Sequence, residues 1–286
     1  MLNNPNLLES IAKFSASHSR GSEFYNSYES GILRDLPQIH SPTSSEVINL
    51  GEVGLFRFPF FNMGNISSAN LFGLDEIILF SFYYANRKRY KNMLDLGANI
   101  GLHTLIMRKL GFNVVSYEPD TTHLEQFKKI MELNNFDMPG VRSKAISNKN
   151  DVMEYIRVLG NTTGSHLSGA KSSPYGETEA IKVETDDILS LLKNEKFDFI
   201  KMDVEGHEVV LLDRITPESI ADTDIMLEIG SKKNANDIFK ILNDKKIPAF
   251  AQKINWQRIK KVEDLPSHHS MGSVFLSMSS TPYWGD

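Results

Sequence analysis

The residues of this chain best suited to chemistry surround a glycine-rich turn that follows a short apolar run. Gly97 and Gly101 let the backbone bend sharply there and approach a ligand without a Cβ in the way. A helix beginning after the turn would aim unpaired N–H groups at whatever the turn holds. Asp95 lies near the end of the apolar run, and its negative charge would repel an anionic ligand. A cationic cofactor without phosphate therefore fits best, and S-adenosylmethionine, which carries a sulfonium and an amino group, is the candidate.

Two other interpretations of this turn call for different residues. A dinucleotide-binding fold places the pattern G-x-G-x-x-G after its first strand. Counting from Gly97, the second and third glycine positions hold Asn99 and Leu102, so a nicotinamide or flavin site is disfavoured. A strand–turn–helix unit that binds nothing would need only one helper glycine, and this turn has two.

The next apolar run, 113–120, carries an acidic residue where a nucleoside-binding fold needs one. Glu118 follows the glycine turn by about 20 residues, the spacing at which such folds place a ribose-binding carboxylate. Its two acceptor oxygens match two vicinal hydroxyls. Taken singly, Glu118 would be a solvated strand end, but together with the glycine turn it predicts a ribose site. Pro119 ends the strand because it lacks an N–H donor.

Composition excludes several classes of protein. The net charge is −5 and no basic run exceeds Arg87–Arg89, so the clustered basic face of a nucleic-acid-binding protein is missing. Because Cys is absent, neither disulfides nor thiolate chemistry is available. Residues 1–20 lack the apolar core of a secretory signal, and the longest apolar stretch, 77–85, falls short of the ~20 residues of a membrane span. We therefore expect a cytoplasmic protein without a membrane span.

Strand and helix patterns alternate along most of the chain, which predicts a Rossmann-like, doubly wound, mostly parallel α/β sheet covered on both faces. Expected strands cover 113–120, 141–147, 152–158, 180–185, 197–204 and 224–229, and expected helices cover 74–90, 122–135, 186–193 and 236–244. The final strands, 249–258 and 273–278, are joined by a loop too short for a helical crossover, so an antiparallel pair is expected.

Two segments lie outside this alternation. Residues 1–75 form a helical and hairpin extension, with the hairpin expected over 47–61, and would serve as a lid or acceptor-binding segment. Residues 159–175 form a polar, glycine-rich loop, and a loop of this length is either disordered or functional. We expect it to be mobile and to form one wall of the acceptor site. The chain thus divides into an extension, 1–75, and a cofactor-binding domain, 76–286.

Three motifs together resemble the FkbM family of methyltransferases. They are Leu94-Asp95-Leu96-Gly97-Ala98-Asn99-Ile100-Gly101, Tyr117-Glu118-Pro119 and Lys201-Met202-Asp203-Val204-Glu205-Gly206-His207-Glu208. The resemblance covers about residues 75 to 230, by the spacing of strands and helices in a doubly wound domain. It implies a Rossmann-like S-adenosylmethionine domain with an antiparallel final strand. It also implies O-methylation of a hydroxyl on a sugar, glycan or polyketide-type acceptor.

The resemblance also implies which residues bind the donor. The glycine turn would hold it, Glu118 its ribose, and the segment around Ala145 and Ile146 would lie next to its adenine. The whole set of expected donor-binding residues is Asp95, Gly97, Ala98, Asn99, Gly101, His103, Glu118, Pro119, Ala145, Ile146 and Asp203.

The candidate catalytic residues are Asp203, Glu205 and His207, since ligands of open α/β sheets sit beyond the carboxyl ends of the strands. Methyl transfer to a hydroxyl needs donor and acceptor held in line and the hydroxyl proton removed. His207, at an expected helix start that would keep it neutral, is the first choice of general base. It could instead be a helix-capping residue.

A metal offers another route at the same place. Asp203, Glu205 and Glu228 would suit Mg²⁺ through their oxygen ligands, but a lone Asp-x-Glu pattern is no diagnostic metal signature. The favoured alternative is that Asp203 contacts the cofactor, Glu205 orients the substrate and Glu228 pairs with Lys201 or Lys232.

The function expected from the sequence is S-adenosylmethionine-dependent O-methylation of a small-molecule or glycan acceptor such as a sugar or polyol. The alternative is a non-catalytic binding module that retains the fold within a glycan-assembly complex. The glycine turn together with Glu118 favours the enzyme, because a degenerate module would need neither. The sequence is compatible with an oligomer.

Overall fold

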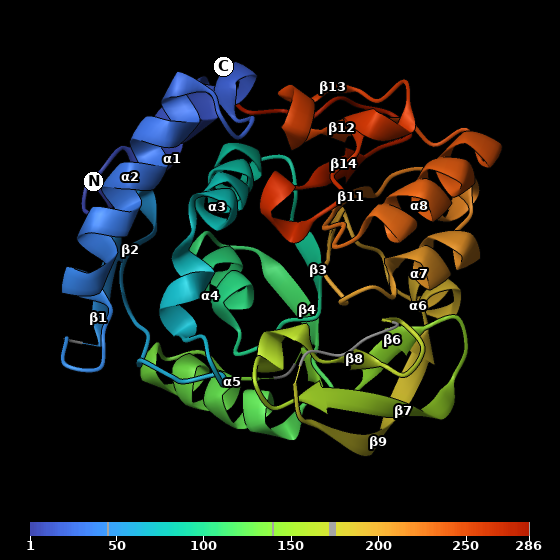
Figure 1. Ribbon diagram of the computed structural model, residues 1–286, viewed down its shortest axis with the longest axis horizontal. Coiled ribbons are helices and arrows are strands. Elements are labelled where there is room, and N and C mark those ends of the chain that lie inside the picture. Colours follow the sequence, from blue (N-terminus) through green and yellow to red (C-terminus); the bar gives the residue numbers. More distant parts are fainter. Residues whose placement is uncertain (45, 139, 172–175, 286) are drawn as a thin grey trace.

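The apolar runs of the sequence form the strands of a central eight-stranded sheet. The computed structural model describes residues 1–44, 46–138, 140–171 and 176–285, and in it the strand order is β13-β12-β14-β11-β10-β3-β4-β5 (Figure 1). The strands are β3 (Asn92–Leu96), β4 (Asn113–Tyr117), β5 (Val141–Arg142), β10 (Phe199–Met202), β11 (Asp224–Leu227), β12 (Ala249–Ala251), β13 (Gln257–Arg258) and β14 (Val274–Leu276). The run from β11 to β5 is parallel, which confirms the predicted Rossmann-like class.

Both faces of this sheet are covered because successive strand residues point to opposite sides. Met93 and Phe199 pack in one hydrophobic cluster, and their neighbours Leu94 and Ile200 pack in another. Figure 1 shows the two helical layers that supply these clusters. One layer holds α3 (Leu74–Asn86), α4 (Leu102–Lys109) and α5 (Thr121–Leu133), and the other holds α6 (Ile188–Asn194), α7 (Glu208–Arg214) and α8 (Lys232–Asp244).

The antiparallel end of the sheet is also confirmed, with one correction. Strand β14 runs antiparallel to both β11 and β12. The single strand predicted over 249–258 is wrong, because a helical turn at Gln252–Ile254 interrupts it and β13 folds back on β12. Asn255 and Trp256 adopt left-handed backbone conformations with φ of 55° and 59°, which ends the strand and places the Trp256 indole in the core.

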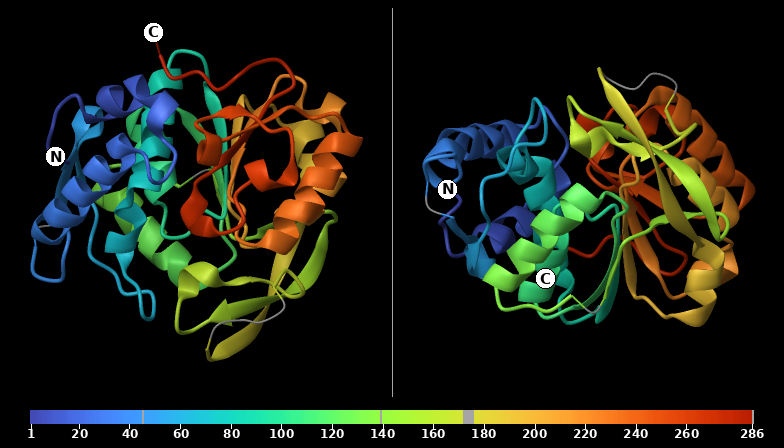
Figure 2. Two further views of the ribbon diagram at one scale, coloured as in Figure 1. Left: turned by 45° about the horizontal axis from the view of Figure 1, so that its top comes forward. Right: turned by 90° about the horizontal axis from the view of Figure 1, so that it is seen from below.

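A second, four-stranded sheet lies at one end of the central sheet, beside α5 (Figures 1 and 2). Its order is β6-β9-β7-β8, and its strands are β6 (Ala145–Ser147), β7 (Asp151–Val158), β8 (His166–Leu167) and β9 (Thr178–Asp187). The strand predicted over 141–147 is therefore two strands in two sheets. Residues 141–142 pair with β4, and 145–147 pair with β9. Pairing partners far apart in the chain leave no local pattern from which the split could be predicted.

The N-terminal extension contains two helices and a hairpin in its described residues. It comprises α1 (Leu7–Lys13), α2 (Glu23–Ile39) and a hairpin of β1 (Val47–Leu50) and β2 (Gly54–Arg57), which confirms the predicted antiparallel pair. Leu8 and Ile11 of α1 pack in the same hydrophobic cluster as α3, α4 and α5. The division of the chain at residue 75 stays a prediction. In the part of the chain described, no helix has the length and apolarity needed to cross a membrane.

Candidate active site

A cavity of about 1090 Å³ opens at the carboxyl ends of the parallel strands. Gly97, Glu118, Asp203 and Glu228, each following a different strand, line it. This is the edge where doubly wound sheets bind ligands. The volume is at the upper end of the usual range for a single small-molecule site, so a cofactor and a second molecule can share it.

The two glycines of the turn are required by packing against other elements. A Cβ on Gly97, where φ is +77°, would lie 1.8 Å from the carbonyl oxygen of Asp203 at the end of β10. A Cβ on Gly101, where φ is +86°, would lie 2.2 Å from the Phe127 ring of α5. Gly97 lines the cavity, but Gly101 does not. The sequence-based reason for these glycines, close approach to a ligand, is therefore incomplete, since neighbouring protein atoms already exclude a side chain.

Asp95 lies beneath the turn, outside the cavity lining. Its carboxylate is fully buried, accepts a hydrogen bond of 2.7 Å from Thr104 Oγ1, and lies 3.7 Å from Lys201 Nζ. The Lys201 ammonium also lies 3.2 Å from the Gly97 carbonyl and 3.3 Å from Asp203 Oδ2. Burial alone would lower the pKa of Lys201, but the charges of Asp203 and Asp95 outweigh it and raise that pKa. Lys201 thus ties β3, the turn and Asp203 together.

The glycine turn fixes the position of Glu118. Its Oε2 accepts a hydrogen bond of 2.8 Å from the Asn99 amide, and its Oε1 accepts one of 2.8 Å from the Asp120 amide. Glu118 is only 3% exposed yet lines the cavity. Each carboxylate oxygen keeps a further acceptor site, so the group can still bind two hydroxyls.

The side of the cavity next to Glu118 is largely apolar. Ala145 and Ile146 lie on β6, are buried, and line the cavity beside Tyr117 and Pro119. Ala98 and Asn99 complete this side at the glycine turn. A flat, uncharged base would find apolar contact here. Of the expected donor-binding residues, all but Asp95 and Gly101 line the cavity.

His103 faces the same cavity from the first turn of α4. Its Nδ1 lies 2.9 Å from the Tyr83 hydroxyl, and its Nε2 lies 2.9 Å from Glu76 Oε2. Both ring nitrogens are occupied, so the imidazole holds the Glu76 carboxylate in the cavity lining. Sequence reasoning missed Glu76, because an acid in the first turn of a helix is ordinary. It offered Lys201 only as a partner of Glu228, whereas the ion pairs of Lys201 are with Asp203 and Asp95.

The Lys201–Glu208 block forms a strand end and a tight turn. Glu205 and Gly206 have φ of +53° and +100°. Glu208 Oε1 closes the turn by accepting hydrogen bonds of 3.0 Å from the Val204 amide and 3.2 Å from the Gly206 amide. Burial raises the pKa of Glu208 to about 7. The block therefore builds a strained loop that presents Glu205 to the cavity.

Carboxylates gather on this side of the cavity. Burial raises the pKa of Glu205 to about 6, although its ion pair with the Lys171 ammonium works in the opposite direction. Burial, together with the charges of Asp203 and Glu205, raises the pKa of Glu228 well above its ordinary value. In the described ranges, no group of three or more His, Cys, Asp or Glu residues is placed to hold a metal ion.

His207 immediately precedes α7 as predicted and lines the cavity, and its ring contacts the second sheet. Its Nε2 lies 3.0 Å from Ser147 Oγ on β6, and the residue is 5% exposed. Burial lowers the pKa of His207 to about 4. The expected neutral state is therefore favoured by burial, not by the helix terminus invoked from the sequence.

The expected acceptor segments both reach the cavity. Arg20, Tyr25 and Asp75 line it from the extension, and residues 161–167 and 169–171 line it from the polar loop. Part of the loop is anchored, since the Asn65 amide donates to the Gly160 carbonyl at 2.7 Å. Residues 172–175 of that loop lie outside the described residues, and its predicted mobility stays a prediction.

Comparison with known proteins identifies the family of this chain. A family model described as a methyltransferase FkbM domain matches residues 95–249. Over 166 residues the chain is 27% identical to the hexuronic acid methyltransferase AglP of Haloferax volcanii. That stretch is 56% of this chain, and the chain spans 65% of the length of AglP.

Similar solved structures include two methyltransferases. One is a ribosomal protein L11 methylase from Lactobacillus delbrueckii subsp. bulgaricus, with 12% identity, a TM-score of 0.37, and coverage of 68% of this chain and 75% of that chain. The other is a SAM-dependent methyltransferase from Agrobacterium tumefaciens, with 10% identity, a TM-score of 0.40, and coverage of 80% and 68%.

Proposed function

The chain belongs to the FkbM methyltransferase family, and from this premise we propose that it transfers a methyl group from S-adenosylmethionine to a hydroxyl oxygen of a saccharide. The family supports methyl transfer. The name of AglP, a hexuronic acid methyltransferase, supports a sugar as acceptor, although the chain spans only 65% of AglP. The observation that carries the proposal is Glu118, a fixed carboxylate that joins the glycine turn and still lines the cavity.

The charges around the cavity suit a cationic donor. Glu76, Asp203, Glu205 and Glu228 bring four carboxyl groups to this side, and the ammonium of Lys201 is already paired with Asp203 and Asp95. When bound, S-adenosylmethionine supplies an electrophilic methyl group on a positively charged sulfur. Glu118 would bind its ribose hydroxyls, and the apolar side near Ile146 would contact its adenine.

We propose Glu205 as the group that removes the acceptor proton. Its side chain is 31% exposed in the cavity, and the Lys171 ammonium orients it. With a pKa of about 6, Glu205 is ionised at neutral pH yet basic enough to accept a proton as the new carbon–oxygen bond forms. His207 suits this role less well, because Ser147 occupies its Nε2 and burial restricts its access. Lys201 would hold Asp203 and the turn in place during the reaction.

The acceptor would lie between the N-terminal extension and the polar loop. Arg20 and Tyr25 from the extension and Asn161 from the loop line the cavity. These side chains offer a guanidinium, a phenol and an amide, which are suited to sugar hydroxyls. The cavity volume is sufficient for both molecules.

A thermal-shift experiment tests the donor part of the proposal. S-adenosylmethionine and S-adenosylhomocysteine at a hundredfold excess over Kd should stabilise the protein by about 2.7 kcal/mol, or about 5–10 °C in Tm. NADH serves as a matched nucleoside control and should leave Tm unchanged. An unchanged Tm with both sulfur compounds would contradict the enzyme and favour a non-catalytic binding module.

A further inference from the structure

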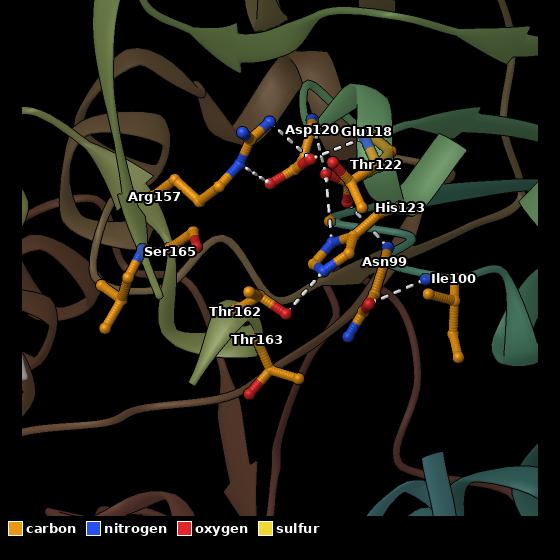
Figure 3. A network of polar contacts seen from close by, with 12 residues as sticks. Asn99, Ile100, Glu118, Asp120, Thr122, His123, Arg157, Thr162, Thr163 and Ser165 are labelled. Atoms are coloured by element: carbon orange, nitrogen blue, oxygen red, sulfur yellow. Dashed lines mark hydrogen bonds and ion pairs between the residues drawn. The ribbon is translucent and has the colours of Figure 1, made fainter. Parts of the chain in front are cut away.

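The second sheet is attached to the first turn of α5 by two polar links (Figure 3). Arg157 of β7 holds the Asp120 carboxylate through two hydrogen bonds, of 2.7 Å from Nε and 2.9 Å from Nη2. His123 Nε2 lies 2.9 Å from Thr162 Oγ1. Asp120 also caps α5 by accepting from the Thr122 amide at 2.8 Å. The site described above gives the side chains of Arg157, Asp120 and His123 no role, although Asp120 and His123 flank Glu118 in space.

His123 is placed between the ribose carboxylate and the second sheet. Its ring is 3% exposed, and its Nδ1 lies 3.8 Å from Glu118 Oε1 on the side away from Thr162. The charged groups that face it are Glu118, Asp120 and Arg157. Burial alone would lower the pKa of His123, but the neighbouring carboxylates of Glu118 and Asp120 outweigh it and raise that pKa. In the imidazolium form, both ring N–H groups donate.

Thr162 begins a short helical turn, Thr162–Gly164, that lines the cavity together with His123. The Thr162 amide donates to the Met63 carbonyl at 3.2 Å, so the N-terminal extension holds the turn on its other side. Asn161 caps the turn by accepting from the Thr163 amide at 3.2 Å. His123 is therefore the link from this turn to the nucleoside end of the cavity.

We propose that His123 is a positioning residue for the ribose of the donor: it fixes the Glu118 carboxylate and fastens the Thr162 turn beside it as a wall of the same subsite. The inference rests on the proposed function, in which Glu118 binds ribose. His123 can act on both because its side chain lies between Glu118 and Thr162. Because Glu118 and the Thr162 turn are held in place before the donor arrives, less conformational entropy is lost when the donor binds. The sequence predicted a helix over 122–135 but gave His123 no role.

Calorimetric titration with S-adenosylhomocysteine tests this role. Thr162→Val keeps the shape of the turn residue and removes the hydroxyl that His123 contacts, and His123→Gln keeps a donor without the charge. Each should weaken binding about three- to tenfold, the cost of one typical net hydrogen bond. Thr122→Val is the matched control, because Thr122 is exposed on the same helix turn and does not line the cavity, and it should bind like the wild type.

The pH dependence of binding gives a readout that a purely structural role would not change. Because the folded pKa of His123 is raised, the imidazolium is present at low pH and is lost as pH rises through that pKa. Wild-type affinity should therefore fall with rising pH relative to His123→Gln. Glu205 and other groups titrate in both proteins, so the difference between the two profiles isolates His123.

Glu118→Gln separates failure of this inference from failure of the proposed function. The inference is supported when S-adenosylhomocysteine binds more weakly to Glu118→Gln, His123→Gln and Thr162→Val than to the wild type. It also requires that affinity falls less steeply with rising pH in His123→Gln than in the wild type. Weaker binding in Glu118→Gln alone overturns the role of His123 and leaves the ribose assignment standing. Unchanged binding in Glu118→Gln, or no binding by the wild type, overturns the ribose assignment and this inference with it. Circular dichroism melts confirm that each variant is folded.

Discussion

Gly97→Ala is the perturbation whose effect the structure defines most sharply. The added Cβ would lie 1.8 Å from the Asp203 carbonyl oxygen, whereas ordinary contact begins at 3.4 Å, so one of the two backbones must move by about 1.6 Å. A displacement of about 1 Å in a catalytic arrangement can cost about a hundredfold in rate. Turnover should fall by at least that factor, because Asp203 and the turn move apart.

Gly111→Ala is the matched control for this change. Gly111 has φ of +93°, and a Cβ there meets nothing within 4 Å, so the substitution imposes only the backbone penalty of about 1–2 kcal/mol. Urea unfolding should show a larger loss for Gly97→Ala than for Gly111→Ala, and calorimetry should show weakened S-adenosylhomocysteine binding only in the former. Equal unfolding free energies and equal affinities in the two variants would refute the argument that the β10 backbone excludes a side chain at Gly97.

The remaining predictions concern the proton acceptor, the metal alternative and the α5 ion pair. Glu205→Gln should lower turnover by about 10²–10⁴ with donor affinity retained, and wild-type turnover should rise with pH through about 6, because Glu205 accepts a proton only when ionised. His207→Gln should lower turnover far less than Glu205→Gln, and a larger loss would restore His207 as the base. Chelators should leave turnover unchanged, and inactivation that Mg²⁺ reverses would restore the metal route. Asp120→Asn should cost about 1–3 kcal/mol of unfolding free energy in urea, since it weakens the pair with Arg157, which keeps Glu179 as its second partner. The lowered pKa of Asp120 means that its contribution is present above pH 3.8 and is lost as pH falls through the folded pKa.

The sequence predicted those features that short segments encode. The turn at Gly97, the carboxylate of Glu118 and the strand ending in Asp203 each depend on residues adjacent in the chain, and parallel strands bring their carboxyl ends to one edge. The class of the fold, the antiparallel final strands and the N-terminal hairpin could therefore be predicted. The placement of these side chains around one cavity followed from the same rule.

Features that depend on contacts between distant segments could not be predicted. The second sheet pairs β7 with β9 across a polar loop, and no periodicity specifies that partner. Glu76 enters the cavity because His103, 27 residues later, holds it. His123 acquires a role only through Thr162, 39 residues away. The contact of His207 with Ser147, 60 residues earlier, could not be predicted for the same reason.

The most direct test of the central claim follows the methyl group itself. The protein is incubated with S-adenosylmethionine that carries a tritiated methyl group, together with a panel of saccharides including uronic acids, and the label is traced after separation. The account predicts label in a saccharide as an acid-stable methyl ether, and label reduced at least a hundredfold with Glu205→Gln. Two results together would contradict the account: no saccharide in the panel becomes labelled, and calorimetry shows that the protein does not bind S-adenosylmethionine.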